Sequence, residues 1–256
     1  MLSRNRIPAA FVTLILILEA ACARHAEPRK LSIAAAADLQ FALAEAARQF
    51  HQTHPQTDLQ VDYGSSGNFY AQIRNGAPFD IFLSADVQYP RTLVQDGIAR
   101  ADSVFVYAAG RLAVWVAASS PFDPATALRD PSVHRIAIAN PQHAPYGRAA
   151  EAALRYMGLY ESVEKKLVLG ENISQTMQFV QSGAADVGMV ALSLAVAPTV
   201  RGQGRYWEVP LEAYPKMEQG GIILKDSAAA REFRAWLLAP AGRSLLKQYG
   251  FFLPGK

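Results

Sequence analysis

Four short segments of the sequence consist largely of small residues and residues that cap helices. They are 36–38 (Ala-Ala-Asp), 64–68 (Gly-Ser-Ser-Gly-Asn), 145–147 (Pro-Tyr-Gly) and 171–174 (Glu-Asn-Ile-Ser). Each lies between an expected strand and an expected helix, where unpaired N–H groups and the helix dipole favour negative charge. If the four turns converge, their N–H and hydroxyl donors form a site for a small anion without lysine or arginine.

Each turn taken singly has a simpler interpretation. Ser, Asn and Asp cap helices for the stability of the helix itself, at about 1 kcal/mol each. The anion site therefore depends on whether the fold brings the turns together.

Strands and helices alternate along the first part of the chain. The expected pairs of strand and helix are 31–37 with 39–50, 60–63 with 68–74, and 80–84 with 87–95. Gly76 and Gly97 end the second and third helices.

A second series repeats this architecture without repeating the sequence. Its expected elements are strands at 112–117, 135–139, 166–169 and 187–191 and helices at 147–157 and 173–181, followed by a strand at 221–225 and helices at 228–238 and 241–249. Strands that alternate with helices imply parallel sheets. The predicted fold class is α/β, with two doubly wound parallel-sheet lobes and a ligand cleft between them.

The predicted domains are a signal peptide at 1–23, lobe 1 at 30–106 plus 220–256, and lobe 2 at 107–219. The chain then crosses between the lobes near Val106 and Gln219, where we expect crossing strands to act as the hinge.

The N-terminal segment is typical of a secretion signal. Two arginines precede an apolar run at 11–18, which is too short to cross a bilayer, and the segment 21–23 (Ala-Cys-Ala) fits a cleavage site. Cleavage after Ala23 predicts a periplasmic protein. Cys22 is an alternative site for a lipid anchor, but Glu19 stands where lipoprotein signals have an aliphatic residue.

Composition excludes several classes of function. Lys and Arg number 25 against 22 Asp and Glu, without a basic run, so nucleic-acid binding is not expected. Apolar residues make up 51% of the chain, which excludes disorder as the main state. The single cysteine lies in the signal, so the mature protein has no thiol chemistry and no disulfide.

An enzyme or a cation site needs residues that the sequence does not supply together. A hydrolase would use Ser65 or Ser66 as nucleophile, His143 as base and Asp80 or Asp86 to orient the histidine. Glycine directly after the second serine departs from the G-x-S-x-G motif, however. His51 and His54 have a spacing that can share a metal, yet no third ligand stands nearby. We therefore expect no catalytic residue, no cofactor and no metal cation. The alternative from a different class of protein is a hydrolase that uses Ser66.

Five segments resemble the periplasmic molybdate-binding proteins of ABC importers. They are 31–39 (LSIAAAADL), 63–68 (YGSSGN), 76–86 (GAPFDIFLSAD), 140–147 (NPQHAPYG) and 249–251 (YGF). The resemblance covers essentially the whole mature chain, and the segment 76–86 is the most specific to the family. It implies a two-lobed type II periplasmic binding protein, expected to be a monomer, which closes on molybdate or tungstate and delivers it to an ABC permease in the inner membrane.

The resemblance also implies which residues bind the ligand. Ser66 matches the family's serine, which offers its hydroxyl and its N–H, and Ser65 precedes it. Tyr146 matches a backbone donor that in some members also uses a tyrosine hydroxyl, and Ile173 matches a donor that uses only its N–H. Ala37 and Asp38 belong to the first turn, so the ligand-binding set is Ala37, Asp38, Ser65, Ser66, Tyr146 and Ile173, with molybdenum held only as its oxyanion.

Asp38 departs from the family pattern, because this position often holds Ser or Asn as a donor. A carboxylate about 4 Å from a dianion costs about 8 kcal/mol at an effective dielectric of about 20. Protonating it at about pH 7 costs about 4 kcal/mol. The carboxylate either caps its own helix and leaves only its N–H for the ligand, or accepts a hydrogen bond from a protonated oxyanion such as hydrogen phosphate or hydrogen arsenate, or the ligand sits differently.

Ala191 is a second departure from the family pattern. Some members have a ligand-binding tyrosine at this position, directly after the strand at 186–190. The hydroxyl of Tyr146 is a candidate replacement from the opposite loop.

Overall fold

The computed structural model describes residues 29–253. The predicted signal peptide at 1–23, Cys22 included, lies outside the described residues. Within 29–253, the helices are too short or too polar to cross a membrane.

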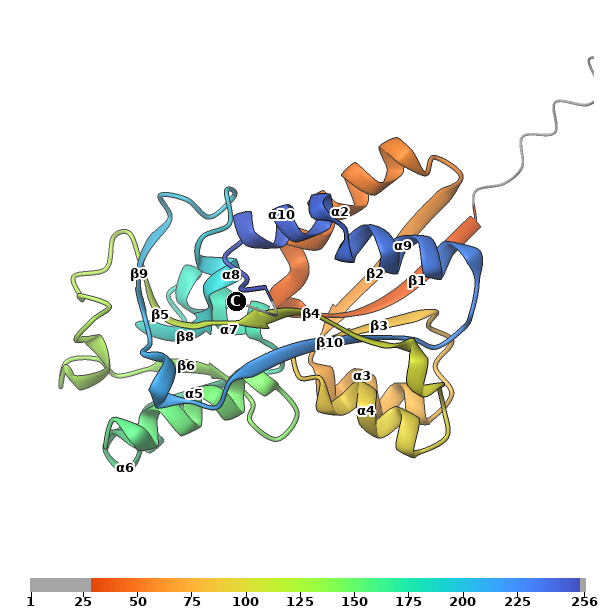
Figure 1. Ribbon diagram of the computed structural model, residues 1–256. Coiled ribbons are helices and arrows are strands. Elements are labelled where there is room, and N and C mark those ends of the chain that lie inside the picture. Colours follow the sequence, from red (N-terminus) through yellow and green to blue (C-terminus); the bar gives the residue numbers. More distant parts are fainter. Residues whose placement is uncertain (1–28, 254–256) are drawn as a thin grey trace, which may run out of the picture.

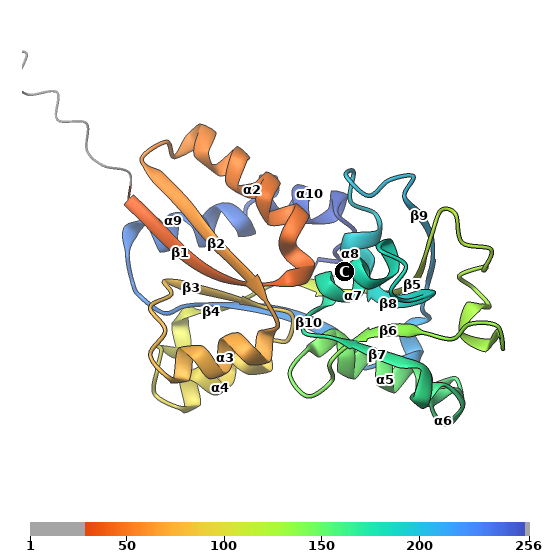
Figure 2. The ribbon, with the colours of Figure 1, turned by 180° about the vertical axis from the view of Figure 1, so that it is seen from behind.

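The first of two lobes is built on a five-stranded sheet with the strand order β2-β1-β3-β10-β4. Its strands are β1 (Arg29–Ala36), β2 (Thr57–Gly64), β3 (Ile81–Ser84), β4 (Val104–Gly110) and β10 (Met217–Ile223). One face is covered by α2 (Gln40–Thr53), α9 (Ala228–Leu238) and α10 (Pro240–Gln248), and the other by α3 (Ser66–Arg74) and α4 (Gln88–Gln95) (Figures 1 and 2). We call this unit lobe 1.

The second lobe, called lobe 2, has a five-stranded sheet with the order β7-β6-β8-β5-β9. Its strands are β5 (Leu112–Ala117), β6 (Ile136–Ala139), β7 (Leu167–Gly170), β8 (Val187–Ala191) and β9 (Gly204–Glu208). The helices α5 (Pro145–Tyr156) and α6 (Tyr160–Val163) lie on one face, and α7 (Ile173–Gln181) and α8 (Leu192–Ala195) lie on the other (Figures 1 and 2). Single 3-10 turns are η1 (Ala37–Leu39), η2 (Ala101–Ser103), η3 (Ala127–Arg129), η4 (Glu164–Lys166) and η5 (Leu211–Ala213).

The sheets are mixed rather than wholly parallel. β1 runs parallel to β2 and β3, and β6 runs parallel to β7 and β8, as the alternation of strands and helices predicts. In contrast, β10 is antiparallel to β3 and β4, and β5 is antiparallel to β8 and β9. β5 and β10 each enter their sheet from the other lobe. A parallel neighbour would need a crossover connection, usually a helix, within the same lobe.

Two strands carry the chain between the lobes. β4 belongs to the sheet of lobe 1, and after Arg111 the chain continues as β5 in lobe 2; it returns through β10. The expected boundaries near Val106 and Gln219 fall inside β4 and β10. The sequence predicted a crossing strand near Val106 without its bounds, and it did not predict β9. The residues of β9 are all exposed or half-buried, which leaves no apolar alternation to detect.

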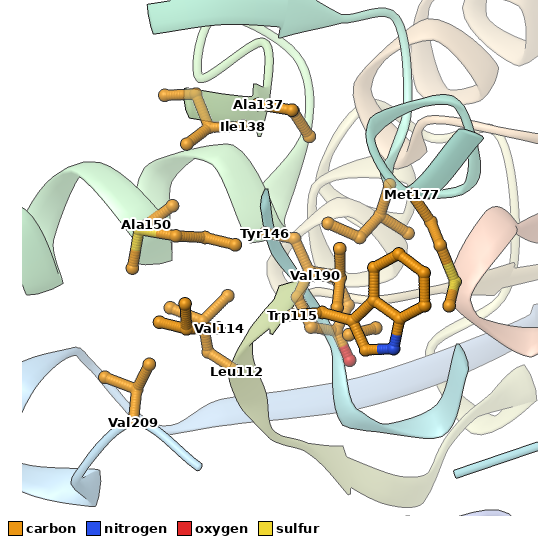
Figure 3. Packing of buried hydrophobic residues seen from close by; sticks show 14 of the residues in the cluster. Leu112, Val114, Trp115, Ala137, Ile138, Tyr146, Ala150, Met177, Val190 and Val209 are labelled. Carbon is orange, nitrogen blue, oxygen red and sulfur yellow. The ribbon is translucent and has the colours of Figure 1, made fainter. Parts of the chain in front are cut away.

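The core of lobe 2 is a cluster of buried apolar side chains around Trp115, which is 1% exposed. Figure 3 shows members of this cluster, among them Trp115, Met177 and Val190. Trp207 packs against the same cluster, and Trp236 packs against a cluster in lobe 1. All three tryptophans therefore serve packing.

Candidate anion-binding site

Each of the four predicted turns joins a strand to a helix. β1 runs into η1, and β2 runs into α3, where the Ser65 hydroxyl caps the helix by accepting a hydrogen bond from the Asn68 N–H at 3.3 Å. β6 leads to α5, which begins at Pro145, and β7 leads to α7, where the Asn172 side chain caps the helix through the Gln175 N–H at 3.0 Å. The capping residues recognised in the sequence thus form helix starts in both lobes.

One cavity brings these helix starts together between the lobes. It is lined by Ala36, Ala37, Asp38, Gly64, Ser65, Ser66, Ala85, Ala144, Pro145, Tyr146 and Ile173. All six residues of the predicted ligand-binding set are among them, and sequence reasoning missed Ala85. No lysine or arginine stands among these lining residues. The cavity measures about 10 Å³, room for about one water molecule, so a four-oxygen anion would need its walls to move apart.

Several backbone donors of the cavity wall are unused. The N–H groups of Ser66, Tyr146 and Ile173 lie in the first turns of α3, α5 and α7 and donate no hydrogen bond to any residue of 29–253. The Ser66 hydroxyl oxygen accepts from the Ala85 N–H at 3.0 Å, which leaves its own proton for another acceptor. These donors come from both lobes and face a site without a cation, which is how helix N-termini bind anions.

Ser65 plays a different part from Ser66. Its hydroxyl lies 2.9 Å from Nδ1 of His143, which comes from lobe 2, and the His143 carbonyl accepts a hydrogen bond from the Gly67 N–H at 2.9 Å. A Cβ on Gly67 would lie 2.5 Å from that carbonyl oxygen, so glycine permits the approach. Ser65 therefore ties the lobes together and caps α3, while Ser66 keeps a free hydroxyl proton.

Asp38 is the one carboxylate of the cavity wall, and it is 1% exposed. Its Oδ2 accepts hydrogen bonds from the Tyr146 hydroxyl at 3.0 Å and from Nε2 of Gln219 at 2.5 Å. Its Oδ1 is buried and has no hydrogen-bond partner among the described residues. The side chain is thus turned towards lobe 2 and β10 rather than serving only as a cap on its own helix. Gln219 was missed as part of the site, because its partner lies far away in sequence.

Burial raises the pKa of Asp38 from 3.8 to about 7. The hydrogen bonds from Gln219 and Tyr146, and less strongly the N–H groups of Asp38 and Leu39, act in the opposite direction. Burial and the nearby Asp38 together raise the pKa of the Tyr146 hydroxyl well above its usual value, so Tyr146 stays a neutral donor.

The hydroxyl proton of Tyr146 is committed to Asp38. Ala191 ends β8 without a hydroxyl, as the sequence requires. The Tyr146 hydroxyl therefore does not stand free as a replacement donor, and the unused donor of this residue is its backbone N–H. A Cβ on the next residue, Gly147, would lie 2.1 Å from the Ala139 carbonyl oxygen, so glycine lets α5 start close to β6.

The other candidate residues lie elsewhere. Asp80 accepts a hydrogen bond from the Ser32 N–H at 2.8 Å, and Asp86 pairs with Arg148 at 2.7 Å, so neither aligns with His143. His54 stacks on Phe50 with 4.1 Å between ring centroids. Within residues 29–253 no cluster of three or more His, Cys, Asp or Glu side chains is placed to hold a metal ion.

The chain matches a known family over nearly its whole described length. The family described as Bacterial extracellular solute-binding protein matches residues 31–252. The molybdate-binding protein ModA of Azotobacter vinelandii is 37% identical over 237 residues, which cover 91% of this chain and 93% of that protein. The ModA of Rhodobacter capsulatus is 38% identical over 192 residues, 74% of this chain and 75% of that protein.

The solved structures agree with the fold. The periplasmic molybdate-binding protein of Azotobacter vinelandii superimposes with a TM-score of 0.82 at 33% identity, covering 88% of this chain and 99% of that one. It is a type II periplasmic binding protein with two α/β lobes, as is this chain. These relatives are binding proteins and not enzymes. The chain belongs to the bacterial extracellular solute-binding proteins, in the group of the molybdate-binding proteins.

Proposed function

We propose that this protein binds molybdate or tungstate in the cavity between the lobes and hands it to an ABC permease in the inner membrane. The observation that carries the proposal is the convergence of the unused N–H groups of Ser66, Tyr146 and Ile173 on one buried cavity without a cation. Such donors suit a compact oxyanion whose charge is spread over several oxygens. The molybdate-binding relatives at 37% and 38% identity support the choice of anion.

Binding in this scheme needs the lobes to open and close. Lobe 1 would comprise 30–106 plus 220–256 and lobe 2 would comprise 107–219, with the hinge in β4 and β10. The permease would recognise the closed form, which a ligand favours by binding it more tightly than the open form. We further propose that the protein acts in the periplasm as a monomer after cleavage at residue 23.

A calorimetric titration of residues 24–256, freed of bound anion, tests this proposal. Molybdate, tungstate, sulfate, phosphate and arsenate are titrated separately at about pH 7. We expect molybdate and tungstate to bind at sub-micromolar Kd, with affinities at least about 100-fold above the others, a difference of about 2.7 kcal/mol. Failure of molybdate and tungstate to bind would overturn the assignment.

A second candidate ligand is a protonated oxyanion such as hydrogen phosphate or hydrogen arsenate. It is favoured by one observation, the buried Oδ1 of Asp38 without a partner, which would accept the proton of the anion. In the same titration this alternative predicts that phosphate or arsenate binds more tightly than molybdate, and that Asp38→Ser reverses the order.

A further inference from the structure

A doubly charged oxyanion in the cavity meets a problem of charge at Asp38, and this inference rests on the proposed function. Asp38 lines the cavity, and no lysine or arginine stands among the lining residues to offset two like charges. Like charges that touch in a buried site repel strongly, because little solvent screens them. A dianion therefore binds well only if the carboxyl group is neutral.

The hydrogen bonds of Asp38 fit a neutral carboxylic acid. Such a group has one carbonyl-like oxygen that accepts and one hydroxyl oxygen that donates. Oδ2 accepts two hydrogen bonds, from Tyr146 and Gln219, whereas the buried Oδ1 has no partner in 29–253 with hydrogen-bond geometry, although the N–H groups of Asp38 and Leu39 lie near the carboxyl group. Oδ2 is thus the accepting oxygen, and Oδ1 is the atom left to carry a proton and donate it to a ligand in the cavity.

The groups that face Asp38 come from four elements and carry no positive charge. They are the Tyr146 hydroxyl on α5, the Gln219 amide on β10, Tyr107 on β4, and the Ser193 hydroxyl on α8, which donates to the Asp38 carbonyl at 2.8 Å. Burial raises the pKa of Asp38 to about 7, while the hydrogen bonds from Gln219 and Tyr146 and, less strongly, the N–H groups of Asp38 and Leu39 lower it. A bound dianion favours the protonated form further.

We propose that Asp38 takes up one proton from solvent at Oδ1 when the cleft closes on a doubly charged oxyanion. The Oδ1 hydroxyl donates a hydrogen bond to an oxygen of the anion, and the proton returns to solvent when the cleft opens. Asp38 thereby serves as a donor whose strength depends on pH. Affinity is flat at low pH and falls about tenfold per unit once pH exceeds the pKa of Asp38 in the empty protein.

The test counts protons in the mature protein with molybdate, which is fully ionised throughout the range used. Titrations at about pH 8 in several buffers of different ionisation enthalpy give the number of protons taken up per anion. We expect close to one proton at about pH 8 and a small fraction at about pH 6, with affinity at least about tenfold lower at the higher pH.

Three variants assign the proton. Asp38→Asn supplies a permanent neutral donor, so proton uptake and the pH dependence of affinity should both disappear. Tyr146→Phe removes a hydrogen bond that favours the charged carboxylate, so the pH at which affinity begins to fall should rise. Asp86→Asn is the matched control, because Asp86 pairs with Arg148 outside the cavity lining, and proton uptake should persist.

The outcomes are distinct. Tight molybdate binding without proton uptake at about pH 8 would overturn the proton linkage and leave the proposed function standing. Proton uptake that persists in Asp38→Asn would show that another group takes up the proton, which would overturn the role of Asp38. Absence of binding by any oxyanion would refute the proposed function itself, and the linkage with it.

A spectroscopic measurement keeps the test open if Asp38→Asn fails to fold. The infrared difference spectrum of the wild type, with and without molybdate at about pH 8, should gain the carbonyl band of a protonated carboxyl group. A spectrum without that band would overturn the proposal.

Discussion

Ser66 and Ser65 are adjacent, yet their hydroxyl groups do different work. Ser66 is fully buried, and its hydroxyl accepts from the Ala85 N–H and keeps its proton for a ligand. The Ser65 hydroxyl is occupied by the Asn68 N–H and by His143. Sequence patterns recognised the pair, but only the positions of Ala85 and His143, both distant along the chain, separate the donor from the cap.

Ser66→Ala should weaken molybdate binding by about 1.5 to 3 kcal/mol, or about 10- to 150-fold, because a hydrogen bond to a charged group is lost. Ser65→Ala is the control; it should reduce the free energy of unfolding by about 1 kcal/mol through the lost cap and lower affinity less. Calorimetry and thermal unfolding of both variants check this, and equal losses of affinity would contradict the separation of roles.

Asp38 also affects the stability of the empty protein. Its pKa is about 7 in the folded state against 3.8 for an unperturbed group, so the folded state binds more protons than the unfolded state between these values. The free energy of unfolding contributed by Asp38 therefore falls as pH rises from about 4 to about 7 and stays low above, a loss of up to about 4 kcal/mol.

Asp38→Asn should remove this loss. We expect the variant to unfold at a higher temperature than the wild type at about pH 8, and the difference to shrink towards about pH 4. Denaturation curves across this range measure it, and a difference that is constant with pH would count against a buried titrating Asp38.

Prediction of individual site residues from the sequence had a clear limit. Ser66, Tyr146 and Ile173 belong to turns with recognisable capping or glycine patterns, and they line one cavity with Asp38. Gln219 has no such signal, because it sits inside β10 and its amide meets Asp38 and Tyr146, both distant along the chain, only in the folded protein.

At the scale of elements, most strands and helices could be read from periodicity, but their directions could not. β4 is an apolar segment that a strand pattern could have found, whereas β9 has little buried surface. The antiparallel strands arise because β4, β5 and β10 connect the lobes directly, which no local pattern encodes. The α/β class and the two lobes are nevertheless confirmed.

An ion pair joins α5 of lobe 2 to lobe 1. Arg148 lies 2.7 Å from Asp86 and donates to the Tyr89 hydroxyl at 3.1 Å. Arg148→Met should lower affinity for molybdate only a few-fold, because the side chains are 41% and 28% exposed and such pairs contribute up to about 1 kcal/mol.

Arg155→Met on the same helix is the control, since Arg155 pairs with Glu151 within α5 and not across the lobes. Stopped-flow measurements should find faster release of molybdate from Arg148→Met and an unchanged release rate from Arg155→Met. Calorimetry should find the few-fold loss of affinity only in Arg148→Met. Equal effects would refute a role in closure.

For the whole molecule, direct contacts between the lobes seal the cavity. The Ser174 hydroxyl of lobe 2 donates to the Ala37 carbonyl at 3.0 Å, and the Ser193 hydroxyl donates to the Asp38 carbonyl at 2.8 Å. Because the cavity of about 10 Å³ has room for about one water molecule, the proposed scheme requires the lobes to separate before an oxyanion enters. Opening along β4 and β10 would break these contacts together. The combined free energy of the contacts stabilises the closed form, so it determines how much of the ligand's binding free energy is needed to close the lobes.

The most direct test is the crystal structure of the mature protein with molybdate, in which anomalous scattering locates molybdenum. We predict the anion in the cavity, its oxygens about 2.7 to 3.2 Å from the Ser66 hydroxyl and from the N–H groups of Ser66, Tyr146 and Ile173. Molybdenum outside this cavity, or an anion held by lysine and arginine side chains, would contradict the account.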